Sequence, residues 1–223
     1  MPDGPLISVR GEAVLEVEPE IAELTVHVMA RGSDRRQTLE RLSARNQECL
    51  DLIKEYGDAV ERLETSGLSV VPIIKDRRRD EKVRTYQGTV RLRVVVSDFS
   101  VLGELVTRLG DQELTSIGGP WWSLRRTSEV YRQARHQAAR EAVTRAREYA
   151  EAVGSRLTGL VELADSGLMG DSAPHHEVMR SMAFAGAAPG AAGPPPIDLE
   201  PEQQTVRATV DARFTATAPD DLT

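Results

Sequence analysis

The residues best suited to chemistry lie late in the chain, where His175, His176 and Glu177 are adjacent. Imidazole and carboxylate groups are ligands that divalent metals use, so this cluster is the first candidate for a metal site. A structural zinc site needs four ligands and a catalytic one three, each oriented by further hydrogen bonds. Neighbouring residues in a long loop do not supply that geometry, and we expect neither a metal nor a cofactor.

No other residue pattern indicates catalysis. No nucleophile elbow occurs, and Gly118-Gly119-Pro120 lacks the spacing and the lysine of a phosphate-binding loop, so it reads as a strand bulge. Cys49 falls on the apolar side of a predicted helix, where a thiol is an inert core group. His27 and His136 have no serine or cysteine placed to use them. We expect a protein that is not an enzyme. Triad members can be far apart in a chain, so an unrecognised hydrolase is a weaker alternative.

The densest basic segment is Arg77, Arg78 and Arg79. Neighbouring carboxylates dilute its charge, and the chain carries a net charge of −7. Such a composition disfavours nucleic acid as a partner. We interpret this basic patch as a solvated hairpin tip whose charges discourage pairing between strand edges.

Two segments favour protein contacts instead. Trp121 and Trp122 are consecutive in a predicted strand, so they face opposite sides and cannot both enter one core layer. One of them is therefore a candidate interface anchor, although burial of both is the competing account. The second segment holds Met179, Met182 and Phe184, because methionines adapt to irregular partner surfaces.

Hydrophobic periodicity defines the elements that carry these residues. The clearest strand is Thr205–Ala216, which alternates apolar and polar residues throughout. The first two strands, around Ile7–Val17 and Ala22–Ala30, are predicted to form a hairpin. A helix from Ser33 or Asp34 to Gly57 follows. The other predicted elements are strands over 61–74 and 86–96, a short helix over 98–110, an interrupted strand over 114–124, a helix over 128–153 and a strand over 157–164.

The order β-β-α-β-β-α-β-α-β-β predicts an α+β fold, an antiparallel-rich mixed sheet with helices packed on one face. One domain would cover residues 6–164 and 203–218. The element order also allows two related halves, 6–75 and 82–218, without a sequence repeat that shows duplication. Residues 1–5 and 219–223 are predicted to be disordered, and 165–202 form a long Met/Ala/Pro-rich loop.

The chain has 223 residues, 40% of them hydrophobic, which is enough for a sizeable core. No run of about 18 apolar residues occurs, so we expect no membrane insertion. The first residues show no basic-then-apolar segment, which favours a cytoplasmic protein, or a periplasmic one from which a signal was removed.

An ordered series of segments resembles the SIMPL domain family, once catalogued as a domain of unknown function. The series extends from about Leu6 to Ala216. Its segments are ISVRGEAVLEVEPEIAEL, LETSGLSVVPI, TYQGTVRLRVVVSDFSVLGELV, EVYRQARHQAAREAVTRAREYAEAVGSRLTGLVEL and IDLEPEQQTVRATVDARF. Relatives often have a glycine-rich turn and a Pro-Asp pair near the start, where this chain has Arg10-Gly11-Glu12 and Pro19-Glu20.

The resemblance implies a modest set of properties. Bacterial relatives are mostly periplasmic or associated with the outer membrane, and some are immunodominant antigens or linked to oxidative-stress defence. One type assembles into a large hollow homo-oligomer, and the family has no established catalytic residues. We therefore expect a homo-oligomeric scaffold or binding module with a stress-related role and no known protein partner. The alternative is a small-molecule-binding module.

Overall fold

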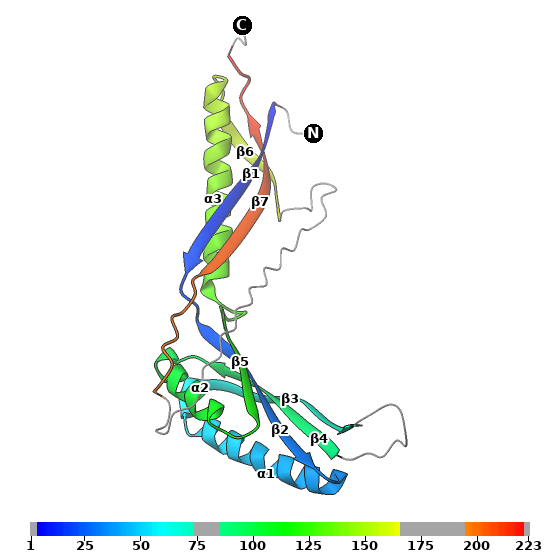
Figure 1. Cartoon of the computed structure of the whole chain (residues 1–223). Coiled ribbons are helices and arrows are strands. Elements are labelled where there is room, and N and C mark those ends of the chain that lie inside the picture. Colours follow the sequence, from blue (N-terminus) through cyan, green and yellow to red (C-terminus); the bar gives the residue numbers. More distant parts are fainter. Residues whose placement is uncertain (1–3, 74–84, 166–194, 221–223) are drawn as a thin grey trace. The chain divides into compact units, whose positions relative to one another are not determined.

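The computed structural model describes residues 4–73, 85–165 and 195–220. They form two compact units (Figure 1). Unit 1 contains residues 4–17, 126–165 and 203–220, and unit 2 contains residues 18–73, 85–125 and 195–202. The ends predicted to be disordered lie outside the described residues at 1–3 and 221–223, as does 166–194 of the predicted long loop.

The α+β fold and the predicted order of strands and helices are confirmed. The strands lie in two separate sheets, both antiparallel. Short 3₁₀ turns precede β3 and α2. The elements are β1 (Leu6–Val17), β2 (Ile21–Gly32), α1 (Arg35–Lys54), β3 (Val60–Ile73), β4 (Thr85–Val96), α2 (Leu102–Gly110), β5 (Thr115–Ser123), α3 (Glu129–Ala152), β6 (Leu157–Asp165) and β7 (Gln204–Ala216).

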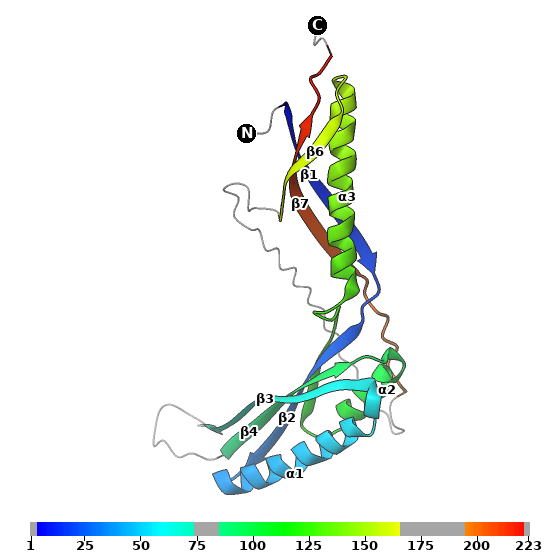
Figure 2. The same ribbon diagram turned by 180° about the vertical axis from the view of Figure 1, so that it is seen from behind.

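Unit 1 is a three-stranded sheet, in the order β1-β7-β6, with α3 packed on one face (Figures 1 and 2). The buried face of α3 is a stripe of alanines four residues apart, which lets the helix lie close to the strands. Alternate residues of β1 and β7, among them Val9, Val210 and Phe214, complete this core. The stripe consists of Ala134, Ala138, Ala142, Ala146 and Ala150.

Unit 2 is a four-stranded sheet, in the order β3-β4-β2-β5, with α1 and α2 on one face. Leu42 and Ile53 of α1 pack with Leu105 of α2 against the alternating apolar residues of β2 and β4. Asp34 begins α1 as predicted, since its Oδ1 accepts a hydrogen bond from Gln37 N at 2.9 Å.

The last part of the predicted long loop belongs to unit 2. Ile197 N donates a hydrogen bond to Thr107 Oγ1 at 3.3 Å, and Leu199 packs against the core of this unit. A side chain at Gly103 would collide with the carbonyl oxygen of Ile197. This segment therefore lies directly on α2.

The predicted hairpin between the first two strands is wrong. β1 pairs with β7, from Leu6 opposite Thr215 to Val17 opposite Gln204. β2 pairs instead with β4 and β5. The chain passes from unit 1 to unit 2 between these two strands, so each pairs within its own unit. Periodicity identified both strands, but it carries no information about a strand's partner.

Candidate functional site

Several predicted site residues lie outside the part of the chain that the structure describes. They are His175, His176 and Glu177 of the possible metal cluster, Arg77, Arg78 and Arg79 of the basic patch, and Met179, Met182 and Phe184 of the proposed interface. Within the described residues, no group of three or more His, Cys, Asp or Glu side chains could hold a metal ion.

The two tryptophans of β5 point in opposite directions. Trp122 packs against the core of unit 2 and meets Phe99 edge-on, with ring centroids 4.8 Å apart. Trp121 is 52% exposed, and its ring lies against Gly118. The Gly118-Gly119-Pro120 stretch is a bulged part of β5, because its register against β2 shifts between Glu23 and Thr25. Of the pair, Trp121 is the residue that a partner could contact.

Two groups with nucleophilic or acid–base potential, Cys49 and His27, have pKa values shifted toward their neutral forms. Cys49 is 1% exposed, and burial is the main cause that raises the pKa of its thiol. The expected core position of Cys49 is confirmed, and a raised thiol pKa disfavours the reactive thiolate. Burial, with a smaller contribution from Arg91, lowers the pKa of His27 on β2.

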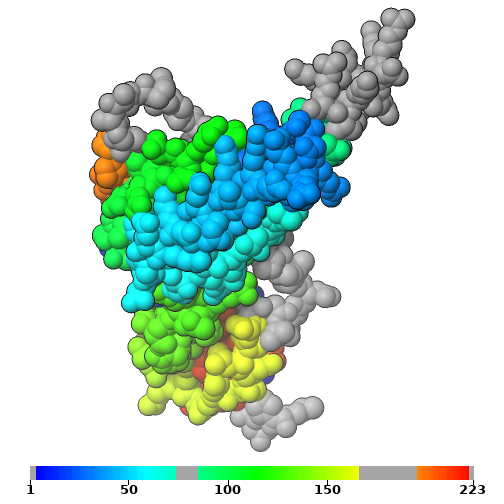
Figure 3. Space-filling view, turned by 90° about the horizontal axis from the view of Figure 1, so that it is seen from below, coloured from blue at the N-terminus to red at the C-terminus, as the bar shows by residue number. Residues whose placement is uncertain are grey.

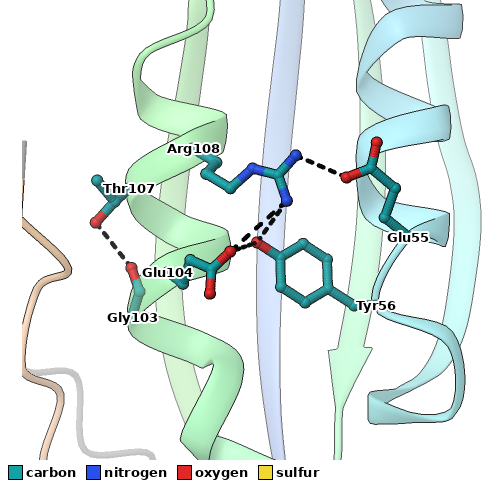
Figure 4. Close-up of polar contacts among 6 residues, drawn as sticks. All are labelled: Glu55, Tyr56, Gly103, Glu104, Thr107 and Arg108. Carbon is teal, nitrogen blue, oxygen red and sulfur yellow. Dashed lines mark hydrogen bonds and ion pairs between the residues drawn. The ribbon is translucent and has the colours of Figure 1, made fainter. Parts of the chain in front are cut away.

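A polar cluster joins α2 to the end of α1 (Figure 4). Arg108 Nη2 donates to Glu55 Oε2 at 2.7 Å and Nη1 donates to Tyr56 OH at 3.2 Å. Tyr56 OH in turn donates to Glu104 Oε1 at 3.1 Å. Burial raises the pKa of the Tyr56 phenol, so the hydroxyl stays protonated. These contacts connect α2 to the end of α1.

Strand β6 is the most exposed apolar strand of unit 1. Leu160, Val161 and Leu163 are 57%, 43% and 50% exposed. Leu160 and Leu163 lie opposite Phe214 and Ala212 of β7, which are buried beneath α3. The two leucines therefore face the same side as the helix, but α3 covers mainly β1 and β7. Figure 3 shows β6, in yellow, at the molecular surface.

A pocket of about 500 Å³ lies in unit 2 at the end of β2. This volume is within the range of about 300–1,000 Å³ typical of small-ligand clefts. Leu114, in the turn before β5, has a φ of 56°, a region that few residues other than glycine adopt. The lining comes from β2, α1 and the turn before β5, and comprises Ala30, Arg31, Arg41, Ala44, Arg45, Glu48, Gln112, Glu113 and Leu114.

The arginines of α1 that line this pocket are oriented by backbone carbonyl groups. Arg41 Nη1 donates to Arg31 O at 2.9 Å. Arg45 Nη1 donates to Glu113 O at 3.0 Å and, at 3.4 Å, to Met29 O, while its Nη2 binds Glu113 Oε2 at 2.7 Å. Sequence reasoning missed the pocket. The only available signal was the spacing of four between Arg41 and Arg45, which places both on one side of a helix.

A family model matches residues 7–214 of the chain. Its description is SIMPL, protein of unknown function (DUF541). The chain belongs to the SIMPL family. The resemblance seen in the sequence is thereby confirmed over nearly the whole chain, and the fold described above is that of a SIMPL protein.

Two curated relatives of this SIMPL chain are 26 kDa periplasmic immunogenic proteins, from Brucella melitensis and from Brucella abortus. Each is 27% identical over 172 residues, which cover 71% of this chain and 66% of the relative. The chain thus matches slightly less than two thirds of their length. The cytoplasmic location expected from the first residues has no support from these relatives.

A solved amidase of the hydantoinase/carbamoylase family, from Burkholderia phymatum, matches with 15% identity and a TM-score of 0.29. The match covers 57% of this chain and 35% of the amidase. A likeness at this level carries no inference for the SIMPL chain. Among the described residues, no helix is long and apolar enough to cross a membrane.

Proposed function

We propose that this SIMPL protein is a non-enzymatic scaffold or binding protein that assembles with copies of itself through β6. The observation that carries the proposal is the exposure of Leu160, Val161 and Leu163 on the outer strand of a three-stranded sheet. Three neighbouring apolar side chains on one short strand are typical of an interaction surface.

The two outer strands of this sheet differ in how they meet solvent. On β1, Glu12 N donates a hydrogen bond to Glu141 Oε2 of α3 at 3.0 Å. β6, like β1, pairs with β7 alone among the described strands, but β6 is the one that carries the three exposed apolar side chains. A second copy of β6 could therefore pack against it about a two-fold axis, which buries the same leucines twice. The two-fold contact alone would give a dimer, and a larger assembly such as the hollow one formed by one type of relative would need a second contact.

The proposed setting is the periplasm, because both Brucella relatives carry that location in their names. A role in stress response rests on the family resemblance alone. Trp121, in unit 2, is a second proposed contact residue, since its ring is large, half exposed and rigid.

The test is the molar mass in solution, measured by light scattering after size exclusion at several concentrations. We expect a multiple of the 24.5 kDa protomer, independent of concentration. The double variant Leu160→Glu, Leu163→Glu should be monomeric, because assembly through β6 would bury two negative charges on each copy without opposite charges to neutralise them. Val14→Glu, at an exposed position on β1, is the matched control. A monomeric parent protein, or assembly that survives the double change, contradicts the proposal.

A further inference from the structure

Strand β2 continues beyond its partner β5. Its pairing with β5 ends where Val28 lies opposite Thr115, whereas its pairing with β4 continues to Gly32 opposite Tyr86. One more backbone bond, from Met29 N to Leu114 O at 2.9 Å, closes the β5 side. From the carbonyl of Met29 onward, this edge of β2 has no strand beside it in the described chain.

Side chains take the place of the missing strand. Arg45 donates to Met29 O and Arg41 donates to Arg31 O, so both open carbonyls accept from guanidinium groups. In an antiparallel strand, the N–H and C=O of one residue point to the same edge. The N–H of Arg31 therefore points into the pocket beside the Arg41 guanidinium. Together they form a donor pair at the end of an open strand edge.

The charges of the pocket are distributed unevenly. Arg45 forms an ion pair with Glu113, and Glu48, which also lines the pocket, lies three residues after Arg45 on α1. Arg41 uses Nη1 on a carbonyl and has no carboxylate partner among the described residues. Its Nε and Nη2 donors are available to an acceptor. A negatively charged group is therefore favoured at Arg41 and disfavoured beside the two glutamates.

We propose that this pocket binds the C-terminal end of an extended peptide, which adds a short strand to β2 beyond β5. The peptide's carboxylate lies on Arg41 and the Arg31 N–H, and its backbone runs along the edge toward Ala44. Addition of a strand to an open sheet edge is a general mode of peptide recognition, in which main-chain hydrogen bonds supply affinity. Each of the two carbonyls, Met29 O and Arg31 O, has a second lone pair that can accept from an N–H of the peptide while the guanidinium group stays bound. The pocket's volume accommodates a few residues rather than a folded partner.

The first experiment uses synthetic N-acetylated tetrapeptides, Thr-Val-Thr-Val and Thr-Ala-Thr-Ala, each prepared with a free C-terminal acid and with a C-terminal amide. Titration calorimetry or NMR should detect saturable binding of at least one acid below about 5 mM. The amide should bind at least about tenfold more weakly, because it loses the charge-assisted hydrogen bonds. Equal binding of acid and amide, or no binding of either acid, overturns the proposal.

Variants locate the site. Arg41→Gln should remove the difference between acid and amide, whereas Arg36→Gln, at an exposed arginine five residues earlier on α1 that pairs with Glu40, should retain it. Ala44→Trp fills the pocket and should abolish binding, while Ser43→Trp places the same ring outside the pocket lining. Peptide binding that is unchanged in Ala44→Trp would contradict the assigned place.

Backbone amide signals separate strand addition from simple charge attraction. The acid peptide should shift the Arg31 amide resonance and slow its hydrogen exchange, because that N–H gains a partner. Acetate serves as the small-carboxylate probe. If acetate binds as tightly as the peptide, or the Arg31 amide is unaffected, strand addition is wrong. These readouts do not depend on the oligomeric state, so they test this site independently of assembly through β6.

Discussion

Gly11 of β1 lies directly beneath Ala142 of α3. A methyl group at Gly11 would come within 2.6 Å of Ala142 N and 2.7 Å of Ala142 Cβ, and it would also collide with the carbonyl oxygen of Ala138. The clash is with helix backbone, which cannot rotate away. The absence of a side chain at Gly11 therefore sets how closely α3 approaches the sheet of unit 1.

Gly11→Ala should destabilise unit 1 by about 3 kcal/mol or more, because α3 must move away from the sheet. Urea unfolding followed by circular dichroism measures the change. Gly67→Ala is the control, since nothing lies within 4 Å of the position a methyl group would occupy there. If both variants unfold like the parent protein, the close approach does not limit packing.

Replacing each tryptophan of β5 by alanine should affect the stability of the fold very differently. Trp122→Ala removes a ring from the core beside Phe99 and should lower the free energy of unfolding by about 3 kcal/mol. Trp121→Ala should change it by less than about 0.5 kcal/mol, as for other exposed positions. The same samples, examined by light scattering, show whether Trp121 contributes to assembly. A large loss of stability in Trp121→Ala would contradict its place at the surface.

The sequence predicted the elements well because each had a complete local signal. The alternation of β7, the alanine spacing of α3 and the cap at Asp34 are all readable within a few residues. Strand partners were not predictable. β1 and β7 are separated by most of the chain, and their alternation of apolar and polar residues is compatible with pairing to any other strand. The division into two sheets depends on those partners, and so it too became visible only in the structure.

The pocket was not predictable because its geometry arises from unequal strand lengths. Arg41 and Arg45 resemble ordinary exposed helix residues in the sequence. They can reach Arg31 O and Met29 O because the pairing of β2 with β5 stops at Val28, four residues before β2 itself ends at Gly32. Pairing register, rather than residue type, creates the open edge.

Stability should fall in mild acid partly because of His27. Burial, and more weakly Arg91, lowers its pKa in the folded chain, so the unfolded chain binds a proton more readily. This contribution is complete above the unfolded pKa of about 6.5 and is lost as the pH falls below it. Urea unfolding between pH 8 and pH 5 should show a shallower decline for His27→Gln than for the parent protein. Parallel curves would contradict this contribution.

Replacing Asn46 of α1 should increase the stability of the protein. Its Oδ1 is buried and accepts no hydrogen bond from the described residues, and an unsatisfied buried acceptor costs about 1–3 kcal/mol. Asn46→Ala removes that acceptor and should raise the free energy of unfolding by about 1 kcal/mol beyond the gain from helix propensity. Ser43→Ala, on the exposed side of the same helix, measures the propensity gain alone, about 0.5 kcal/mol. Chemical denaturation compares the two, and a loss of stability in Asn46→Ala would contradict this prediction.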